Sequence, residues 1–400
     1  MPKAGGVGNS AGVLNVVGAG LILAAGKRGL SYKDAILAIV DSAARRAGIL
    51  EKSKSRGRSS NGASRRKHLK VGLTFNLKRS DTTRDDSEAE FDSPKTIAGL
   101  RGALQELGHE VQEFEAVSDL PLRLAHSEVD IVFNIAEGLS GRNREAQVPA
   151  LCELLRIPHT GSDVATLSLC LDKALCKRIL LQAGIPTPGF AVVVPGKEKL
   201  PRDLRYPLIA KPNAEGTSKG LDSKSVVESE DGLREQVRRL IERYRQPVII
   251  EEYVTGRELT VGLVGWPRPK LLAPMEMIIK EPGVKHPVYH YKLKQDFTEF
   301  VEMRCPAELS DAESRALEKV AREAFGTLGC LDVARIDFRL AGGVPYVIEV
   351  NPLPGLNPGF SDLCLIAEHS GLPYLDLIRE IFSGALRRTR AGSSPRSPAR

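Results

Sequence analysis

The feature that most constrains this chain is a pair of alternating runs in residues 333–359, joined by a glycine turn. Alternation with period two places apolar side chains on one face of a strand and polar side chains on the other. In chain order, the polar face carries Arg335, Asp337, Glu349 and Asn351, and the apolar face of the second run carries Tyr346, Ile348 and Val350. A hairpin that turns at Gly343 places position 337 opposite 349 and position 335 opposite 351.

Opposed carboxylates on such a hairpin indicate a cation site. Directly opposed Cβ atoms lie roughly 4.5–5.5 Å apart, so Asp337 and Glu349 would repel each other. A cation removes that cost, and Asp, Glu and Asn supply the hard oxygen ligands that suit Mg²⁺ or Mn²⁺ held jointly with substrate phosphates. The rigid turn at 352–355 places further backbone amides beside the site. An exposed hairpin with a solvated polar face would show the same alternation and is the alternative.

Composition and charge describe a compact body with basic ends. Hydrophobic residues make up 42% of the 400 residues and aromatic residues 5%. The net charge is +7, but residues 1–43, 44–70 and 387–400 contribute +2, +9 and +5, so residues 71–386 carry −9. Basic ends can bind nucleic acid or anionic lipid, but solvated, disordered ends are the simpler interpretation, and neither partner is expected. The six cysteines form no CxxC pair, which indicates buried, reduced thiols and a cytoplasmic protein.

The order of expected elements divides the chain into five segments. Strand–helix–strand order after residue 69 predicts a parallel sheet, and we expect one long helix over 163–183 and another over 362–382. The fold class is therefore α/β (α+β). The segments are an N-terminal extension and basic linker, partly disordered (1–68), an α/β domain (69–161), a central subdomain (162–252), a C-terminal subdomain with the metal site (253–386) and a disordered basic tail (387–400).

Three further motifs are weak when taken singly. In KPNAEGTSKG, residues 211–220, a lysine precedes a small-residue loop whose amides can meet a phosphate, although an ordinary hairpin loop would look the same. In IIEEYVTGRE, Glu251 and Glu258 flank a crossover that can bind adenine and ribose, or that forms a solvated turn. Lys173 and Lys177 lie one turn apart on a helix, where most lysines are solvated.

Taken together and in order, these pieces resemble the D-alanine–D-alanine ligase branch of the ATP-grasp superfamily over roughly residues 69–383. The matching pieces are LDKALCKRILLQAGIPTP, AKPNAEGTSKG, EEYVTGRELTV, ARIDF and EVNPLPGLNP. The resemblance implies an ATP-grasp fold, in which an N-terminal parallel α/β domain precedes two ATP-grasp subdomains that hold ATP between them.

The resemblance also implies a role for each matching residue. Lys173 and Lys211 look like the lysines that contact ATP phosphates, Glu251, Glu252 and Val254 like the adenine-binding residues, and Glu258 like the ribose-binding carboxylate. Asp337, Glu349 and Asn351 match the ligands of two Mg²⁺ or Mn²⁺ ions. Arg335 matches the acyl-phosphate arginine, Lys294 the loop lysine near the γ-phosphate, Thr217 and Ser218 the loop hydroxyls near the substrate, and Gly355 the glycine of an oxyanion site. Glu88, ahead of Glu90, resembles the carboxylate that holds the first substrate's ammonium group.

Departures from the family pattern fall on positions that face the substrates. Glu137 stands where the family has histidine, Gln295 where it has tyrosine, and Phe360-Ser361 where it has a serine–leucine pair. The first hypothesis is therefore an ADP-forming D-alanine–D-alanine ligase that acts through an acyl phosphate in peptidoglycan synthesis. The second is a similar ligase for other amino acids or a specialised acid, and the third is a nucleotide-binding protein without catalysis. The resemblance implies ATP and small amino-acid-like substrates as partners, and a homodimer as the assembly.

Overall fold

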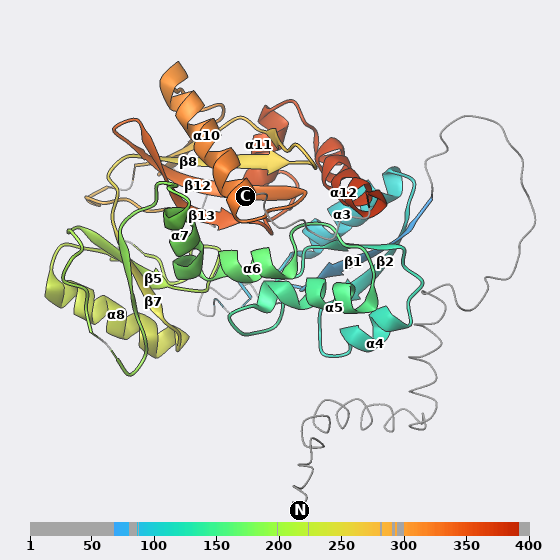
Figure 1. Ribbon diagram of the computed structural model, residues 1–400, viewed down its shortest axis with the longest axis horizontal. Coiled ribbons are helices and arrows are strands. Elements are labelled where there is room, and N and C mark those ends of the chain that lie inside the picture. The colour runs from blue at the N-terminus through green and yellow to red at the C-terminus, as the bar shows by residue number, and fades with distance from the viewer. Residues whose placement is uncertain are drawn as a thin grey trace, which may run out of the picture. The chain divides into compact units, whose positions relative to one another are not determined.

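The computed structural model describes residues 68–391, except 80–85, 87, 198, 223, 281, 290–292 and 294–299. Most of the two predicted terminal segments, 1–68 and 387–400, lies outside the described residues. Within the described part, the chain forms one parallel sheet followed by two antiparallel sheets (Figure 1). This arrangement is of the predicted α/β (α+β) class.

The N-terminal sheet has the strand order β2-β1-β3, with every pairing parallel. Its elements are β1 (Lys70–Phe75), α3 (Pro94–Glu106), β2 (Glu110–Glu115), α4 (Leu120–Ala125), β3 (Ile131–Asn134), the 3-10 helix η1 (Arg144–Ala146) and α5 (Gln147–Leu155). The carboxyl ends of β1 and β3 open toward the loops that carry Glu90 and Glu137. These loops therefore lie at the edge where parallel α/β sheets bind ligands.

Helix α3 shows how local sequence fixes one of these elements. The Ser93 side chain accepts a hydrogen bond from the Thr96 amide at 3.2 Å, and proline occupies the first helical position. The helix buries Leu100 and Leu104 against the sheet, and the chain leaves it at Gly108, whose φ of 89° favours glycine.

The central subdomain has a four-stranded antiparallel sheet of order β4-β7-β5-β6. Its elements are α6 (Val164–Leu171), α7 (Lys173–Gln182), β4 (Phe190–Val193), β5 (Leu208–Pro212), β6 (Val226–Val227), α8 (Glu230–Tyr244) and β7 (Val248–Glu252). The prediction of one long helix over 163–183 is wrong. Asp172 adopts an extended conformation, with ψ of 93°, and its carboxylate accepts from the Leu175 amide at 3.0 Å, so it ends α6 and caps α7.

The C-terminal subdomain contains a sheet of order β11-β10-β8-β12-β13, with β9 paired to β8. Its elements are β8 (Arg257–Val264), β9 (Lys270–Leu271), β10 (Met275–Ile279), β11 (Val301–Arg304), α10 (Asp311–Thr327), β12 (Val333–Ala341), β13 (Val344–Asn351), α11 (Asp362–His369) and α12 (Tyr374–Arg390). The predicted helix over 362–382 is likewise two helices, because Gly371 (φ 70°) and Pro373 interrupt it. Helix α12 also continues to Arg390, past the predicted boundary at 386. Arg388 there pairs with the buried Asp332 at 2.6 Å.

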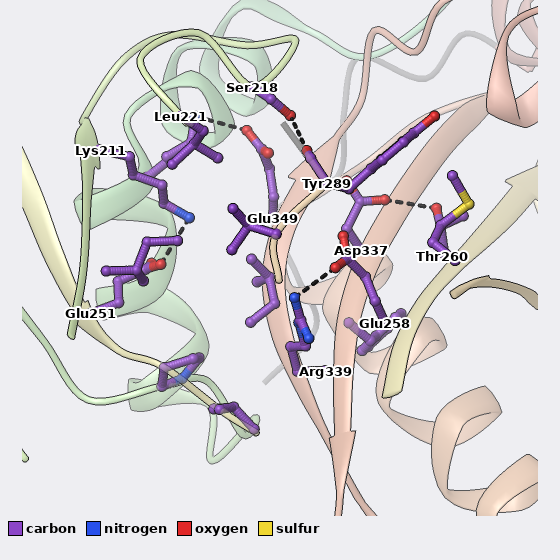
Figure 2. Close-up of a pocket in the computed structure, with 18 of the residues that line it drawn as sticks. Lys211, Ser218, Leu221, Glu251, Glu258, Thr260, Tyr289, Asp337, Arg339 and Glu349 are labelled. Atoms are coloured by element: carbon purple, nitrogen blue, oxygen red, sulfur yellow. Dashed lines mark hydrogen bonds and ion pairs between the residues drawn. The ribbon is translucent and has the colours of Figure 1, made fainter. Parts of the chain in front are cut away.

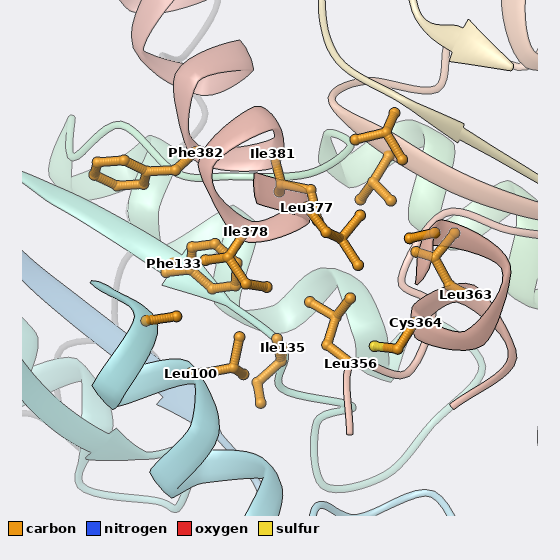
Figure 3. Close-up of a cluster of buried hydrophobic side chains, with 14 of the residues drawn as sticks. Leu100, Phe133, Ile135, Leu356, Leu363, Cys364, Leu377, Ile378, Ile381 and Phe382 are labelled. Carbon is orange, nitrogen blue, oxygen red and sulfur yellow. The ribbon is translucent and has the colours of Figure 1, made fainter. Parts of the chain in front are cut away.

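The largest core joins the N-terminal sheet to the end of the chain (Figure 3). Phe133 of β3 and Leu100 of α3 meet Ile378 and Phe382 of α12 in this cluster, and all four are at most 2% exposed. Burying one such side chain contributes about 1.5–3 kcal/mol. The last helix therefore fixes the N-terminal sheet beside the C-terminal subdomain, and with it the loops that follow β1 and β3.

The structure also describes the six cysteines and the character of the helices. The six cysteines are free thiols, of which Cys305 alone is partly exposed. None of the helices in the described ranges has the length and apolar character needed to cross a membrane.

Candidate active site

The β12–β13 hairpin has the register predicted from its alternation. Asp337 pairs with Glu349, and Arg335 pairs with Asn351. This pairing places all four polar side chains on one face of the sheet, where Arg335, Asp337 and Glu349 line a pocket between the central and C-terminal sheets.

The prediction that Tyr346, Ile348 and Val350 share the apolar face of the second strand is wrong for the part of the strand before Glu349. A bulge between Asp337 and Phe338 shifts the pairing so that Phe338 lies opposite Val347. An extra residue on one strand reverses the faces beyond it. Val347 is therefore fully buried, whereas Ile348, expected on the apolar face, lines the pocket beside Glu349.

Asp337 is held by hydrogen bonds from three sides. Thr260 of β8 donates to it at 2.7 Å, the Asn351 amide at 3.1 Å, and the Arg335 guanidinium in a two-pronged contact at 2.9 and 3.0 Å. Arg335 also approaches Asp362, at the start of α11, at 3.3 Å. Burial disfavours the charge of Arg335, but the two aspartates outweigh it and raise the pKa of the guanidinium. Arg335 is therefore a fixed positive charge in the lining of the pocket.

Lys173, the first residue of α7, crosses to the hairpin. Its Nζ lies 2.7 Å from the Glu349 carboxylate and also donates to the backbone carbonyl of Glu215 in the loop after β5. Burial lowers the pKa of this ammonium, but Glu349 together with Glu90 and Glu251 outweighs burial, and the net pKa is raised. The contact links the central subdomain, the loop and the hairpin at one point.

A second lysine pair surrounds Glu251 on the central sheet. Lys177 Nζ lies 2.9 Å from one carboxylate oxygen and Lys211 Nζ 2.8 Å from the other. Lys177 also donates to the Thr187 hydroxyl at 2.7 Å. Burial alone would raise the pKa of Glu251, but the two lysines outweigh it and lower that pKa to about 2. Glu251 therefore balances buried positive charge, and its carboxylate also lines the pocket.

The remaining walls of the pocket come from the crossover after β7 and from β8 (Figure 2). Glu252, Tyr253 and Val254 line it, and the adenine-binding role expected of Glu252 and Val254 stays a prediction. Glu258 accepts from Arg339 at 2.6 Å, and the Arg339 guanidinium lies over the Tyr253 ring, 5.2 Å from its centroid. Figure 2 shows Lys211 and Glu251 facing Glu258, Asp337 and Arg339 across this pocket.

Loop 213–220 covers part of the pocket. Thr217 and Ser218 both have positive φ, 49° and 57°, which non-glycine residues rarely adopt outside constrained loops. The Ser218 hydroxyl donates to the carbonyl of Tyr289 at 2.9 Å, so the loop is tied to the C-terminal subdomain. Both residues line the pocket, and their place near a substrate stays a prediction.

A second pocket adjoins the first and shares Thr217, Arg335 and Glu349 with it. Gly355 and Asn351 line it from the C-terminal subdomain, and three glutamates, Glu90, Glu137 and Glu145, line it from the N-terminal domain. Burial, then the nearby acids, raise the pKa of Glu137 well above its usual range, and burial raises the pKa of Glu145 to about 8. This wall therefore differs from that of a site built around histidine at position 137.

Glu88 accepts from the Arg79 amide at 2.7 Å and is not among the residues that line either pocket, whereas Glu90 lines the second one. Lys294 and its neighbour Gln295 lie outside the described residues.

The donor set fits a divalent cation bound together with phosphate. Asp337 and Glu349 are side by side and about one quarter exposed, and Asn351 adds an amide oxygen on the same face. Among the described residues, no group of three His, Cys, Asp or Glu side chains is close enough to enclose a metal alone. Sites completed by substrate phosphate oxygens have this incomplete protein shell.

Several residues of the site have no clear signal in the sequence. The only hint for Lys177 is that it lies one helical turn after Lys173, which is a weak signal because lysines on helices are usually solvated. Arg144, Lys219 and Arg339 pair with acids 54 to 129 positions away, and no local pattern predicts such contacts.

A parallel α/β domain followed by two antiparallel sheets that close on a lysine- and carboxylate-lined pocket defines an ATP-grasp protein. The family model described as D-ala D-ala ligase C-terminus matches residues 179–383. The chain belongs to the D-alanine–D-alanine ligase family, which confirms the resemblance found in the sequence.

Individual relatives agree with this assignment. The chain is 32% identical over 294 residues to the D-alanine–D-alanine ligase of Syntrophotalea carbinolica, covering 73% of this chain and 91% of the relative. It is 33% identical over 296 residues to the uncharacterized protein y4sG of Sinorhizobium fredii, covering 72% and 86%. The crystal structure of the Bacillus anthracis D-alanine–D-alanine ligase complexed with ATP matches with a TM-score of 0.64 at 23% identity, covering 81% of this chain and all of that one. This likeness confirms the ATP-grasp fold.

Proposed function

We propose that this protein is an ATP-dependent, ADP-forming ligase of the D-alanine–D-alanine ligase kind, which joins a carboxylate to an amine through an acyl phosphate. The observation that carries the proposal is the convergence of Lys173, Lys211, Arg335 and the paired carboxylates of the hairpin on one pocket in a chain of this family. Phosphoryl transfer depends mainly on positioning and charge neutralisation, and these groups supply both.

ATP is proposed to occupy the first pocket. Lys173 and Lys211 face the phosphates, Glu252 and Val254 offer backbone to the adenine, and Glu258 accepts from the ribose. Glu251 orients Lys211 through its 2.8 Å contact and would stay ionised across the physiological range, because its pKa is about 2. The Glu258–Arg339 pair at 2.6 Å fixes the carboxylate that the ribose would meet.

The reaction is proposed to proceed in two steps. A carboxylate oxygen of the first substrate bonds to the γ-phosphorus of ATP, and the bond from that phosphorus to the ADP oxygen breaks. The amine of the second substrate then bonds to the acyl carbon, loses a proton and expels inorganic phosphate. Arg335 would bind the acyl phosphate, and the Gly355 amide would face the oxygen that gains charge in the second step. Lys294 is proposed to approach the γ-phosphate, and Thr217 and Ser218 the substrate.

Asp337, Glu349 and Asn351 are proposed to hold two Mg²⁺ or Mn²⁺ ions with the ATP phosphates. Such ions neutralise phosphate charge as it is redistributed during transfer. In the structure the Lys173 ammonium lies against Glu349 and the Arg335 guanidinium against Asp337, so each acid already has a positive neighbour.

D-alanine is the first substrate to test, for a role in peptidoglycan synthesis. One observation favours the alternative, a ligase for another amino acid or a specialised acid. Glu137 and Glu145 form a wall of the second pocket. The carboxyl of Glu137, whose pKa is raised by burial, offers this wall a different hydrogen-bonding group from the histidine of the family, which favours a different substrate. Loss of catalysis is the weakest alternative, because the residues matched to metal and phosphate binding remain in place. The homodimer, the cytoplasmic location and the lack of a nucleic-acid partner stay predictions.

The test is ADP release with Mg-ATP across a panel of D- and L-amino acids, alone and in pairs. Release with D-alanine alone, together with the dipeptide, would support the cell-wall role, and release with another pair would support the alternative. Glu349→Ala should abolish release in protein shown by circular dichroism to remain folded at the assay temperature, with the exposed Glu323→Ala on α10 as the matched control. Unchanged release in Glu349→Ala would overturn the metal assignment, and no release with any pair would overturn the ligase proposal.

A further inference from the structure

The carboxylate of Glu90 is bound by groups from two parts of the chain. Arg144 of η1 donates to both of its oxygens at 2.8 Å, and Lys219 of loop 213–220 lies 3.0 Å from one of them. The backbone amide of Gly216 donates to the other oxygen at 2.6 Å. Glu90 therefore joins the N-terminal domain to a loop that begins at the end of β5 in the central subdomain.

These contacts form a closed, buried network. The side chains of Glu90, Arg144 and Lys219 are 5%, 9% and 7% exposed. Glu215 completes the charge balance, 3.1 Å from Lys219 and 3.6 Å from Arg144. Burial opposes the charge of Glu90, but Arg144 and Lys219 together hold the pKa of that carboxyl below its usual range. With both oxygens engaged by the protein, Glu90 is poorly placed to bind a substrate ammonium group.

The approach of the loop to Glu90 depends on glycine at position 216. A Cβ added there would lie 2.5 Å from the Glu90 carboxylate oxygen, well inside contact distance. Arg144 also donates to the Ala214 carbonyl at 2.8 Å. The N-terminal domain thus forms hydrogen bonds with the backbone of the loop as well as with its side chains.

The backbone held by Glu90 and Arg144 adjoins the residues that line the first pocket. The carbonyl of Glu215, next to Gly216, accepts from Lys173, which contacts Glu349. Thr217 and Ser218 follow, and both line the first pocket. A displacement of the loop at Gly216 would therefore move the groups that surround the phosphates.

We propose that Glu90, Arg144 and Lys219 are positioning residues that latch loop 213–220 in its closed position against the N-terminal domain. The latch keeps water from the acyl phosphate until the amine attacks, an inference that rests on the proposed function. Its direct physical consequence, a loop held closed by Glu90, does not depend on which substrates are joined.

Two variants test the latch from opposite sides. Glu90→Gln removes the charge from the N-terminal side, and Gly216→Ala forces the Glu90 carboxylate and the loop apart without changing any charge. The controls are Glu230→Gln, which affects an exposed ion pair with Arg234, and Gly102→Ala, where an added Cβ meets nothing within 4 Å. The first readout is amide hydrogen exchange over residues 213–220, with and without Mg-ATP.

We expect both latch variants to accelerate exchange by about tenfold or more within 213–220, with the rest of the chain and both controls unchanged. Unchanged exchange in the loop, or a uniform increase across the whole chain, would overturn the latch and leave Glu90 a purely structural residue. This outcome is read without any turnover, so it is independent of the proposed function.

The second readout is the ratio of ADP released to amide product with the pair that supports turnover, D-alanine being tested first. We expect the ratio to rise severalfold in both variants while the KM for ATP changes by less than about threefold, because the phosphate lysines are intact. An equal fall in ADP and product, with the ratio unchanged, would refute the role in excluding water. A wild-type protein that releases no ADP would refute the proposed function instead.

Discussion

Replacing Glu251 by glutamine should destabilise the protein far more than the loss of one ion pair at the surface. The carboxylate is 1% exposed and lies between two buried lysines, Lys177 at 2.9 Å and Lys211 at 2.8 Å. Its pKa falls from 4.5 to about 2 although burial alone would raise it, and because one pKa unit is about 1.4 kcal/mol, the surroundings as a whole favour the ionised form by about 3 kcal/mol. Removing one partner of a buried pair typically costs about 3–5 kcal/mol, and here two positive charges would be left facing each other.

The assay is urea unfolding at pH 7, with circular dichroism and fluorescence as two probes of the same transition. We expect Glu251→Gln to lower the free energy of unfolding by about 3–5 kcal/mol. Adding Lys177→Met should recover part of the loss, because it returns the buried charge to its original sum, and a double-mutant cycle measures that coupling. The exposed pair of Glu230 and Arg234 is the control, where Glu230→Gln should change little.

The pH dependence provides an independent check of sign. Because the folded-state pKa of Glu251 is depressed, its contribution is complete above pH 4.5 and is lost as the pH falls toward 2. The difference between wild type and Glu251→Gln should therefore be constant from pH 7 to 5 and shrink below that. A loss of less than 1 kcal/mol at pH 7, or a double variant no more stable than Glu251→Gln, would refute this account of the buried triad.

Three other predictions concern stability. Leu100→Ala empties a fully buried position between α3 and α12 and should cost about 2–5 kcal/mol in urea unfolding. Ser310→Ala removes the capping box of α10, in which Ser310 and Glu313 bond reciprocally, and should cost about 1 kcal/mol, seen as a lower melting temperature. Burial raises the pKa of Asp92 to about 8, so between pH 3.8 and 8 the folded chain keeps a proton that the unfolded chain loses, and wild type loses stability as the pH rises. Asp92→Asn should therefore be more stable than wild type at pH 7 and equal to it near pH 4, and a pH-independent difference in melting temperature would contradict this.

The sequence predicted those parts of the molecule that local periodicity controls. Alternation within the segments 335–337 and 349–351 agrees with the observed register of Asp337 against Glu349, although a bulge at Ile348 interrupts the alternation farther along β13. The same reasoning gave the parallel N-terminal sheet and helices α3 and α10. The ordered motifs then identified the family, and most residues that they named line one pocket.

What the sequence did not reveal depends on contacts between distant residues. Asp172 ends a helix because its carboxylate caps α7 and accepts from the Asn213 amide at 2.8 Å, 41 positions away. Lys177 of α7 is buried because the carboxylate of Glu251 on β7, far away in the sequence, pairs with its ammonium group. Glu90, which ranked second to Glu88 in the sequence, proved to line the second pocket only once the fold brought Arg144 and loop 213–220 around it.

Because of the bulge in the β12–β13 hairpin, the pairing of Asp337 with Glu349 and the apolar side chain next to Glu349 depend on different residues. Ile348 is the residue without a partner, since Asp337 pairs with Glu349 and Phe338 pairs with Val347. A chain shortened by this single residue would retain every backbone pairing of the hairpin and keep Glu349 opposite Asp337. It would lose only the apolar surface that Ile348 presents to the pocket. Deleting Ile348 should therefore reduce the apolar surface that the pocket offers a bound ligand, while the paired residues of the hairpin stay the same.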